Sequence, residues 1–168
     1  MPTNELRAAL DVLNQALCLE VDGEDFYRQA ATRTADAKGR QMYLELADQE
    51  AWHQALIRRQ IDSLTASGEW TPDERIQGFT CDLSQSLFPQ GAERARAVGP
   101  RANELEALWF AIDKEAQSYE LYRQAALQAQ STMAKALYQY LMSAEREHFD
   151  LLMGNYEAIL REQYRADT

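Results

Sequence analysis

The chain has 168 residues, enough for one domain with its own hydrophobic core, and a net charge of −10. This charge, with no block of Lys or Arg, argues against a nucleic-acid binder and against attachment to an anionic membrane surface. There are two cysteines, no signal-peptide-like start and no apolar stretch of membrane-spanning length, so we expect a cytoplasmic protein with one domain over residues 1–168 and no disulfide framework.

Helical periodicity predicts four long helices. Apolar residues recur every three or four positions over residues 3–36, 38–67, 101–130 and 131–161. Gly68 is the expected stop of the second helix. Because no segment shows the alternation of a strand, the sequence predicts an all-α fold.

A long connection separates the two helix pairs, over about residues 69–100. Thr71 and Pro72 at its start resemble an N-cap followed by a first helical residue, which predicts a short helical turn. A connection of this length can travel back the roughly 45 Å of one helix, so the second and third helices can point the same way. The joins within each pair are short and predict antiparallel hairpins. We therefore expect a four-helix bundle of two hairpins joined by a long crossover. Four apolar residues of the crossover are expected to lie against the bundle: Phe79, Leu83, Leu87 and Phe88.

The two hairpins repeat each other at an offset of 95 residues. Residues 26–31 recur almost unchanged at 121–126, and the offset continues without a gap across the predicted turns. A repeat of this kind implies two similar hairpins packed about a pseudo-two-fold axis. Shared helical patterning could explain recurring Leu and Ala, but it does not explain recurring Glu and His on an apolar seam.

Each predicted hairpin carries one Glu-x-x-His motif, and these motifs contain the only two histidines. A spacing of three brings both side chains onto one face of a helix. A further glutamate on the facing helix of each hairpin is as far from the predicted turn as the histidine. We therefore expect six side chains to meet in one layer: Glu20, Glu50, His53, Glu115, Glu145 and His148.

Glutamate and histidine side chains on apolar helix seams are expected to be buried, so their charges need partners. An isolated buried carboxylate costs several kcal/mol unless it is paired or neutralised, and no Lys or Arg lies on the seams at this level. Two divalent ions would balance the four carboxylates. Oxygen-rich ligation with one nitrogen per metal suits iron, with manganese or zinc as alternatives, and this arrangement occurs in di-iron and di-manganese carboxylate bundles. The alternative, protonated glutamates beside satisfied core histidines, leaves more polarity unexplained.

The motifs, the repeat and the crossover resemble the ferritin-like superfamily, and most closely the rubrerythrin group. The resemblance covers nearly the whole chain and implies that the six residues are ligands of two iron ions, with Glu50 and Glu145 as bridging carboxylates. It also implies that Tyr27 and Tyr122 donate hydrogen bonds to ligand carboxylates. The alternative for these two residues is an ordinary core tyrosine with some other partner.

Two features depart from the rubrerythrin pattern. Rubrerythrins usually carry an extra glutamate three residues after the third-helix ligand, where this chain has Ser118, whose repeat equivalent is Gly23. Glycine inside a helix costs about 0.5–1 kcal/mol relative to alanine, so we expect this pair of small residues to leave access for O2 or peroxide. Because the only cysteines are Cys18 and Cys81, a rubredoxin-like four-cysteine module is missing, and electrons would come from a separate donor such as a rubredoxin.

The resemblance implies a di-iron oxidoreductase that reduces peroxide or O2. Three alternatives stay open at this point: iron storage or sensing without turnover, a hydroxylase or manganese enzyme on the same scaffold, and a metal-free structural bundle. The symmetric pair of motifs counts against a storage ferritin, whose site is usually asymmetric. By family analogy alone we also expect a homodimer.

Overall fold

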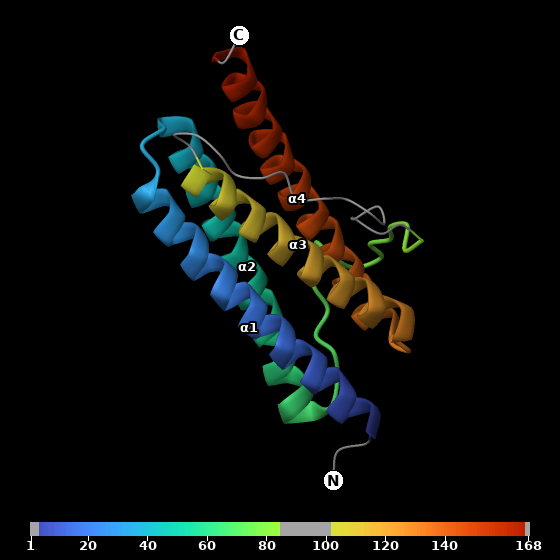
Figure 1. Ribbon diagram of the computed structural model, residues 1–168. Helices are drawn as coiled ribbons and strands as arrows, with labels where there is room; N and C mark the ends of the chain where they lie inside the picture. Colours follow the sequence, from blue (N-terminus) through green and yellow to red (C-terminus); the bar gives the residue numbers. More distant parts are fainter. Residues whose placement is uncertain (1–3, 85–101, 167–168) are drawn as a thin grey trace.

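The computed structural model describes residues 4–84 and 102–166, which form four long helices (Figure 1). Their bounds are α1 (Asn4–Arg33), α2 (Ala37–Ser67), α3 (Ala102–Gln128) and α4 (Thr132–Ala166). The described residues contain no strand, which confirms the predicted all-α class. Among them no helix combines the length and the apolar character that a membrane crossing requires.

Local capping explains where the helices of each hairpin meet. The side chain of Asp36 accepts a hydrogen bond of 2.6 Å from the Gly39 N–H and starts α2. Its repeat equivalent, Ser131, accepts one of 3.3 Å from the Ala134 N–H and precedes α4. The preceding helices, α1 and α3, end at Arg33 and Gln128, two to three residues before the predicted ends. At the other end of α2, Gly68 adopts the left-handed backbone conformation (φ 74°) and caps the helix as predicted.

The last helix is longer than its apolar pattern suggested. It continues to residue 166, whereas the predicted end was residue 161. Residues 162–166 lack Gly and Pro and consist mostly of good helix formers, so nothing local stops the helix. The apolar pattern marks only the part of a helix that packs against its neighbours, and α4 extends beyond that part.

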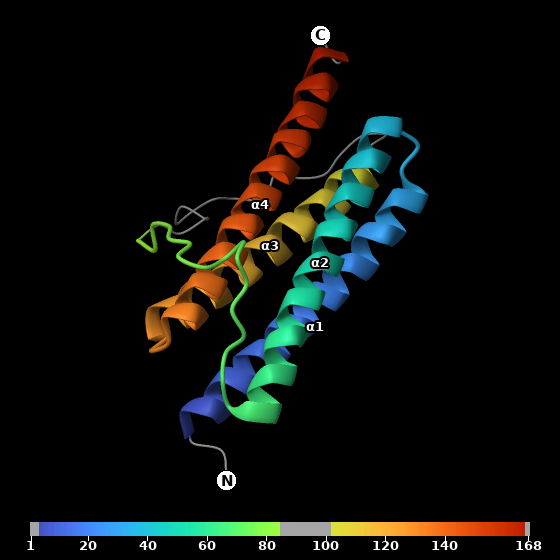
Figure 2. The same ribbon diagram turned by 180° about the vertical axis from the view of Figure 1, so that it is seen from behind.

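The helices pair as two antiparallel hairpins, α1 with α2 and α3 with α4 (Figures 1 and 2). The two hairpins meet mainly along α1 and α3. Both views show that α2 and α3 run in the same direction, so the chain must return along the bundle between them. This is the geometry for which the long connection was predicted.

The start of the crossover differs in detail from the prediction. The short turn begins at Asp73 and not at Thr71: the Asp73 side chain accepts the Arg75 N–H at 3.0 Å, and its carbonyl accepts the Gln77 N–H at 2.9 Å. Thr71 is instead tied to α2, because its N–H donates to the side chain of Gln60 at 3.0 Å. A contact distant in sequence therefore displaces the expected cap by two residues.

The described part of the crossover packs on α4. The ring of Phe79 meets Tyr140 edge-on at a centroid distance of 5.7 Å, and Leu83 packs against the core, both as predicted. The other two expected contacts, at Leu87 and Phe88, lie outside the described residues, as does the crossover from residue 85 onward.

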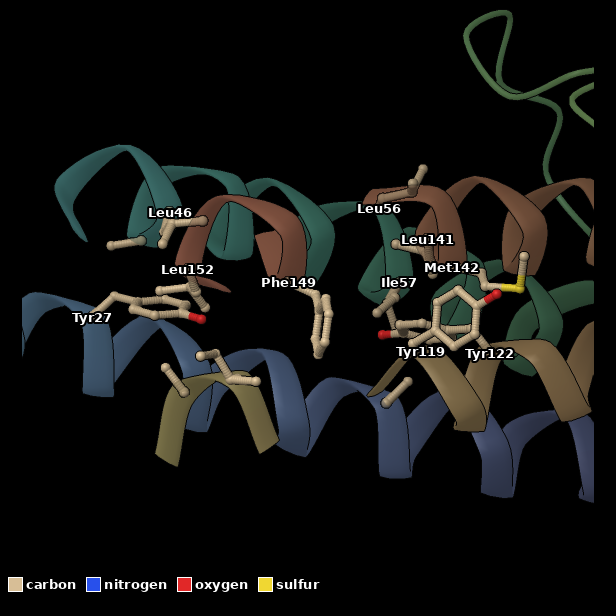
Figure 3. Packing of buried hydrophobic residues seen from close by; sticks show 14 of the residues in the cluster. Tyr27, Leu46, Leu56, Ile57, Tyr119, Tyr122, Leu141, Met142, Phe149 and Leu152 are labelled. Carbon is tan, nitrogen blue, oxygen red and sulfur yellow. The ribbon is translucent and has the colours of Figure 1, made fainter. Parts of the chain in front are cut away.

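Large apolar side chains fill the bundle from end to end (Figure 3). Figure 3 shows Tyr27 near Leu46 and Leu152 on one side of Phe149, and a second group that includes Tyr122 and Leu141 on the other. Several of these side chains are completely shielded from solvent, among them Leu46, Tyr122, Leu141 and Leu152. Any polar group at mid-bundle is therefore held in a low-dielectric interior.

Candidate metal centre

Six buried polar side chains form one layer that draws on all four helices. One glutamate comes from each of α1 and α3, and one Glu-x-x-His pair comes from each of α2 and α4. Each of the six is at most 3% exposed. They are Glu20, Glu50, His53, Glu115, Glu145 and His148. The structure thus brings together all six residues that the sequence singled out, in a common layer.

Two glutamates, Glu50 and Glu145, are shared between two overlapping groups of possible ligands. The first group contains Glu20, Glu50, His53 and Glu145, and the second contains Glu50, Glu115, Glu145 and His148. Within each group, one possible ligand atom per residue lies within 4.8 Å of the others. Each group offers three carboxylates and one imidazole, the donor set expected for one ion of a dinuclear site.

Both histidines direct Nδ1 toward the carboxylates. The Nδ1 atom of His53 lies 3.1 Å from Glu20 Oε2 and 3.4 Å from Glu50 Oε2. The Nδ1 atom of His148 lies 3.2 Å from Glu50 Oε1 and 3.5 Å from Glu115 Oε2. The two rings are nearly parallel, at 22°, with centroids 5.7 Å apart. Nδ1 is therefore the inner nitrogen of each ring, and Nε2 is the outer one.

Two buried tyrosines donate hydrogen bonds to the cluster, and they do so across the hairpins. The hydroxyl of Tyr27 on α1 donates to Glu115 on α3, and that of Tyr122 on α3 donates to Glu20 on α1. Figure 3 shows the two tyrosines on opposite sides of Phe149. Each tyrosine thus bonds to the glutamate of the other hairpin, a pairing that the sequence pattern did not reveal. Their role beside a metal stays a prediction.

Two of the four carboxyl groups have raised pKa values and two have lowered ones. Burial, together with the charge of Glu50, raises the pKa of Glu20 to about 8. Burial and the charges of Glu20 and Glu115 raise the pKa of Glu145 well above its ordinary value. Burial also acts on Glu50 and Glu115, but the side chains around them, above all Glu20 for the first and His148 for the second, outweigh it and lower both pKa values.

The same environment raises the pKa values of both histidines. Burial alone would lower the pKa of His53, but hydrogen bonds and charges of Glu20 and Glu50 outweigh it and raise the pKa to about 9. For His148, burial again acts to lower the pKa, but the nearby carboxylates of Glu115 and Glu50 outweigh it and raise the pKa to about 10. Without a cation, protons held by the groups with raised pKa values therefore offset the buried negative charge.

Two polar atoms of the cluster lack hydrogen-bond partners among the described residues: Glu145 Oε1 and His148 Nδ1. The latter is close to a Glu50 oxygen but is not aligned with it for a hydrogen bond. Buried polar atoms are normally satisfied, so their orientation calls for a further partner. A cation that favours carboxylate oxygen and imidazole nitrogen fits this position, and iron and manganese have that preference. The donor set is thus compatible with a di-iron site.

A cavity of about 350 Å³ reaches the cluster between α1 and α3. The carboxylates of the cluster form part of its lining, together with Phe26, Phe110, Gly23 and Ser118. A Cβ atom built on Gly23 would lie 3.4 Å from the Cγ atom of Glu50, so a larger side chain there would narrow the cavity beside a shared carboxylate. Both small residues lie where an access role was predicted, and that role stays a prediction.

One polar contact escaped the sequence patterns. The Oε1 atom of Gln49, a residue exposed on α2, lies 3.0 Å from the outer nitrogen of His148, Nε2. The repeat gives no signal for this residue, because its equivalent is Ala144. The only hint in the sequence is its position next to Glu50.

Comparisons with known proteins agree with this architecture. The sequence model of the Rubrerythrin family matches residues 11–156. The fold is similar to that of a hypothetical protein from Pyrococcus furiosus, with a TM-score of 0.68 and 23% identity over 91% of this chain and 90% of that chain. At this level of identity the likeness concerns the fold alone. No curated protein matches the sequence.

Proposed function

Because the chain belongs to the rubrerythrin family, we propose that its buried cluster holds two iron ions and reduces peroxide or O2 with electrons from a separate donor. The observation that carries this proposal is the pair of overlapping ligand groups at the end of a cavity. Four carboxylates with two neutral imidazoles balance two divalent ions, which removes the cost of burying the charges.

Each iron ion would have its own residues and two that it shares. Glu20 and His53 would hold one ion, and Glu115 and His148 would hold the other. Glu50 and Glu145 would serve both, since they belong to each group of possible ligands. Three oxygen donors and one nitrogen at each position match the preference of iron and leave room for a small ligand.

When bound, the iron pair supplies two electrons for cleavage of an O–O bond, so that H2O2, two electrons and two protons give two waters. The protein residues provide the setting for this reaction. The cavity admits a small molecule between α1 and α3, beside Gly23 and Ser118. Tyr27 and Tyr122 hold one glutamate of each position in place. The apolar layers on both sides limit the access of bulk water.

The electrons come from outside this chain in the proposed reaction. The sequence has two cysteines, too few for a four-cysteine iron site. A small iron–sulfur protein of the rubredoxin type is a suitable one-electron donor. We also propose, on family analogy, that two copies of the chain associate as a homodimer.

Stopped-flow absorption of the diferrous protein tests the proposal. The protein is loaded with two Fe(II) per chain and mixed with H2O2 under anaerobic conditions. Its iron should be oxidised in one rapid phase that consumes one H2O2 per two iron ions. A paired variant, E50Q with E145Q, should fail to retain the ions and should show no such phase. Inertness of the loaded protein toward both H2O2 and O2 would contradict the proposal.

A second candidate, oxidation of a small organic molecule at the same centre, is favoured by the size of the cavity. A water molecule in the liquid occupies about 30 Å³, and the cavity of about 350 Å³ lies in the range of small-molecule sites. Phe26 and Phe110 give part of its wall an apolar character. Mass spectrometry of neutral aromatic compounds incubated with the reduced protein and O2 distinguishes the two reactions, because only the second adds oxygen to the compound.

A further inference from the structure

The two histidines of the centre differ at their outer nitrogens. The Nε2 atom of His148 lies 3.0 Å from Oε1 of Gln49, a side chain that reaches from α2 of one hairpin to α4 of the other. The position equivalent to Gln49 in the second hairpin is Ala144, whose methyl group cannot accept a hydrogen bond. The pseudo-two-fold symmetry of the ligands therefore does not extend to the residues behind them.

The surroundings of His53 are aromatic instead. Its ring meets that of Tyr140 edge-on, at 85° and a centroid distance of 6.5 Å. Phe79 of the crossover packs edge-on against the same tyrosine. The repeat equivalent of Tyr140 is Glu45, so this feature is also confined to one half of the bundle. One histidine thus has an amide oxygen at its outer edge, and the other has an aromatic ring beside it.

An acceptor at the outer nitrogen matters for metal binding at the inner one. A histidine that presents the Nδ1 lone pair to a metal carries its proton on Nε2, and a hydrogen bond from Nε2–H fixes this tautomer and the orientation of the ring. It also makes the ligating nitrogen more basic. Loss of such a partner typically weakens metal binding by about 10–100-fold.

We propose that Gln49 makes the two metal positions unequal, so that the position at His148 binds a divalent ion about 10–100-fold more tightly than the position at His53. The centre then loads in order, and the ion at His53 is the first to leave. Gln49 is a positioning residue, since it acts through His148. The inference rests on the proposed metal centre, and it adds an order of binding that the symmetric ligands do not imply.

Calorimetric titration of the metal-free protein with Mn²⁺ tests the order of binding. The wild type should bind two ions in two steps whose dissociation constants differ by about 10–100-fold. Q49L, which keeps the size of the side chain but removes the acceptor, should weaken the tight step by this factor and leave the weak step unchanged. Q49E, which keeps an acceptor oxygen, should retain the two separate steps.

Two further measurements separate positioning from a general loss of structure. Q117L is the matched control, because Gln117 is exposed on α3 two residues from Glu115 and bonds only to Asp113 of its own helix in the contacts described. Its titration should equal that of the wild type. Mössbauer spectra with one equivalent of ⁵⁷Fe(II) should show one dominant doublet in the wild type and two comparable ones in Q49L.

The outcomes distinguish this inference from the proposed function. Two equal binding steps in the wild type, or a Q49L titration identical to the wild type, would overturn the role of Gln49 and leave the metal centre intact. If the metal-free protein binds neither Mn²⁺ nor Fe(II), the proposed centre itself fails, and the inference fails with it.

Discussion

At the scale of single residues, the crossed tyrosine bonds decide how the buried carboxylates are held. Tyr27 and Tyr122 are 2% and 0% exposed, and each donates to a glutamate that is at most 3% exposed. A hydrogen bond to a charged acceptor, such as Glu115 with its lowered pKa, contributes about 1.5–3 kcal/mol, and an acceptor left unpaired in the interior loses that amount. The tyrosines therefore stabilise the cluster whether or not a metal is bound.

Replacement of one hydroxyl group tests this role. Y27F should lower the free energy of unfolding of the metal-free protein by about 1.5–3 kcal/mol, because Glu115 loses its donor. The control is Y138F: Tyr138 is 3% exposed, and its hydroxyl has no partner among the described residues. That variant should be neutral or slightly more stable in urea unfolding. Equal losses in Y27F and Y138F would show that the crossed bond contributes nothing.

At the scale of elements, a buried carboxylate helps to fasten the start of the crossover to α2. The Asp73 side chain is 4% exposed and accepts hydrogen bonds from Arg75 and, at 3.3 Å, from Arg59 on α2. The hydrogen bond from the Arg75 guanidinium, more than any other contact, lowers the pKa of Asp73. Both arginines are more than half exposed, so solvent screens much of this attraction.

The pH dependence of D73N follows from the lowered pKa. A carboxyl group with a lower pKa in the folded state stabilises the protein above its unfolded pKa, near 3.9, and loses this effect as the pH falls through the folded value. D73N should therefore cost about 1 kcal/mol at pH 7, with the difference from wild type shrinking below pH 4. Urea unfolding across this range measures the difference. The control is D48N: the Asp48 side chain is 77% exposed and 3.4 Å from Arg28, so its replacement should change the free energy of unfolding at pH 7 little.

At the scale of the whole molecule, the polar layer couples the two hairpins. Each group of possible ligands takes residues from both hairpins, so an ion in either position ties one hairpin to the other. An ion that binds only the folded chain raises the free energy of unfolding in proportion to the logarithm of its concentration over its dissociation constant. Metal loading should therefore act on the stability of the entire bundle.

Metal loading should also release protons. Glu20 and Glu145 have raised pKa values, as do both histidines, so near pH 7 the metal-free cluster holds protons that two divalent ions displace. Apparent affinity should rise with pH through the range from about 8 to about 10, in which Glu20, His53 and His148 lose their protons. Calorimetric metal titrations in buffers of different ionisation enthalpy measure the number of protons released. Release of no protons would contradict this charge balance.

The fold and the residues of the centre could be read from local patterns. Helical periodicity and the stop at Gly68 are properties of neighbouring residues, and the repeat with its offset of 95 is visible in the sequence alone. Together they were sufficient to predict four helices and two hairpins. The six polar residues stood out because Glu and His on an apolar seam conflict with burial. The predicted cap at Thr71 was wrong because its contact with Gln60 depends on the position of another helix.

The sequence by itself determined the helices, their pairing into hairpins and the six residues that face one another, since helix periodicity and tight turns are set within short stretches of chain. Only the tertiary structure decided which glutamate each tyrosine reaches, that a cavity opens beside Gly23, and that Gln49 supports His148 while His53 has no equivalent amide. These features depend on the distance and rotation between the two hairpins. Side chains across the whole bundle set that packing, and no local pattern records it.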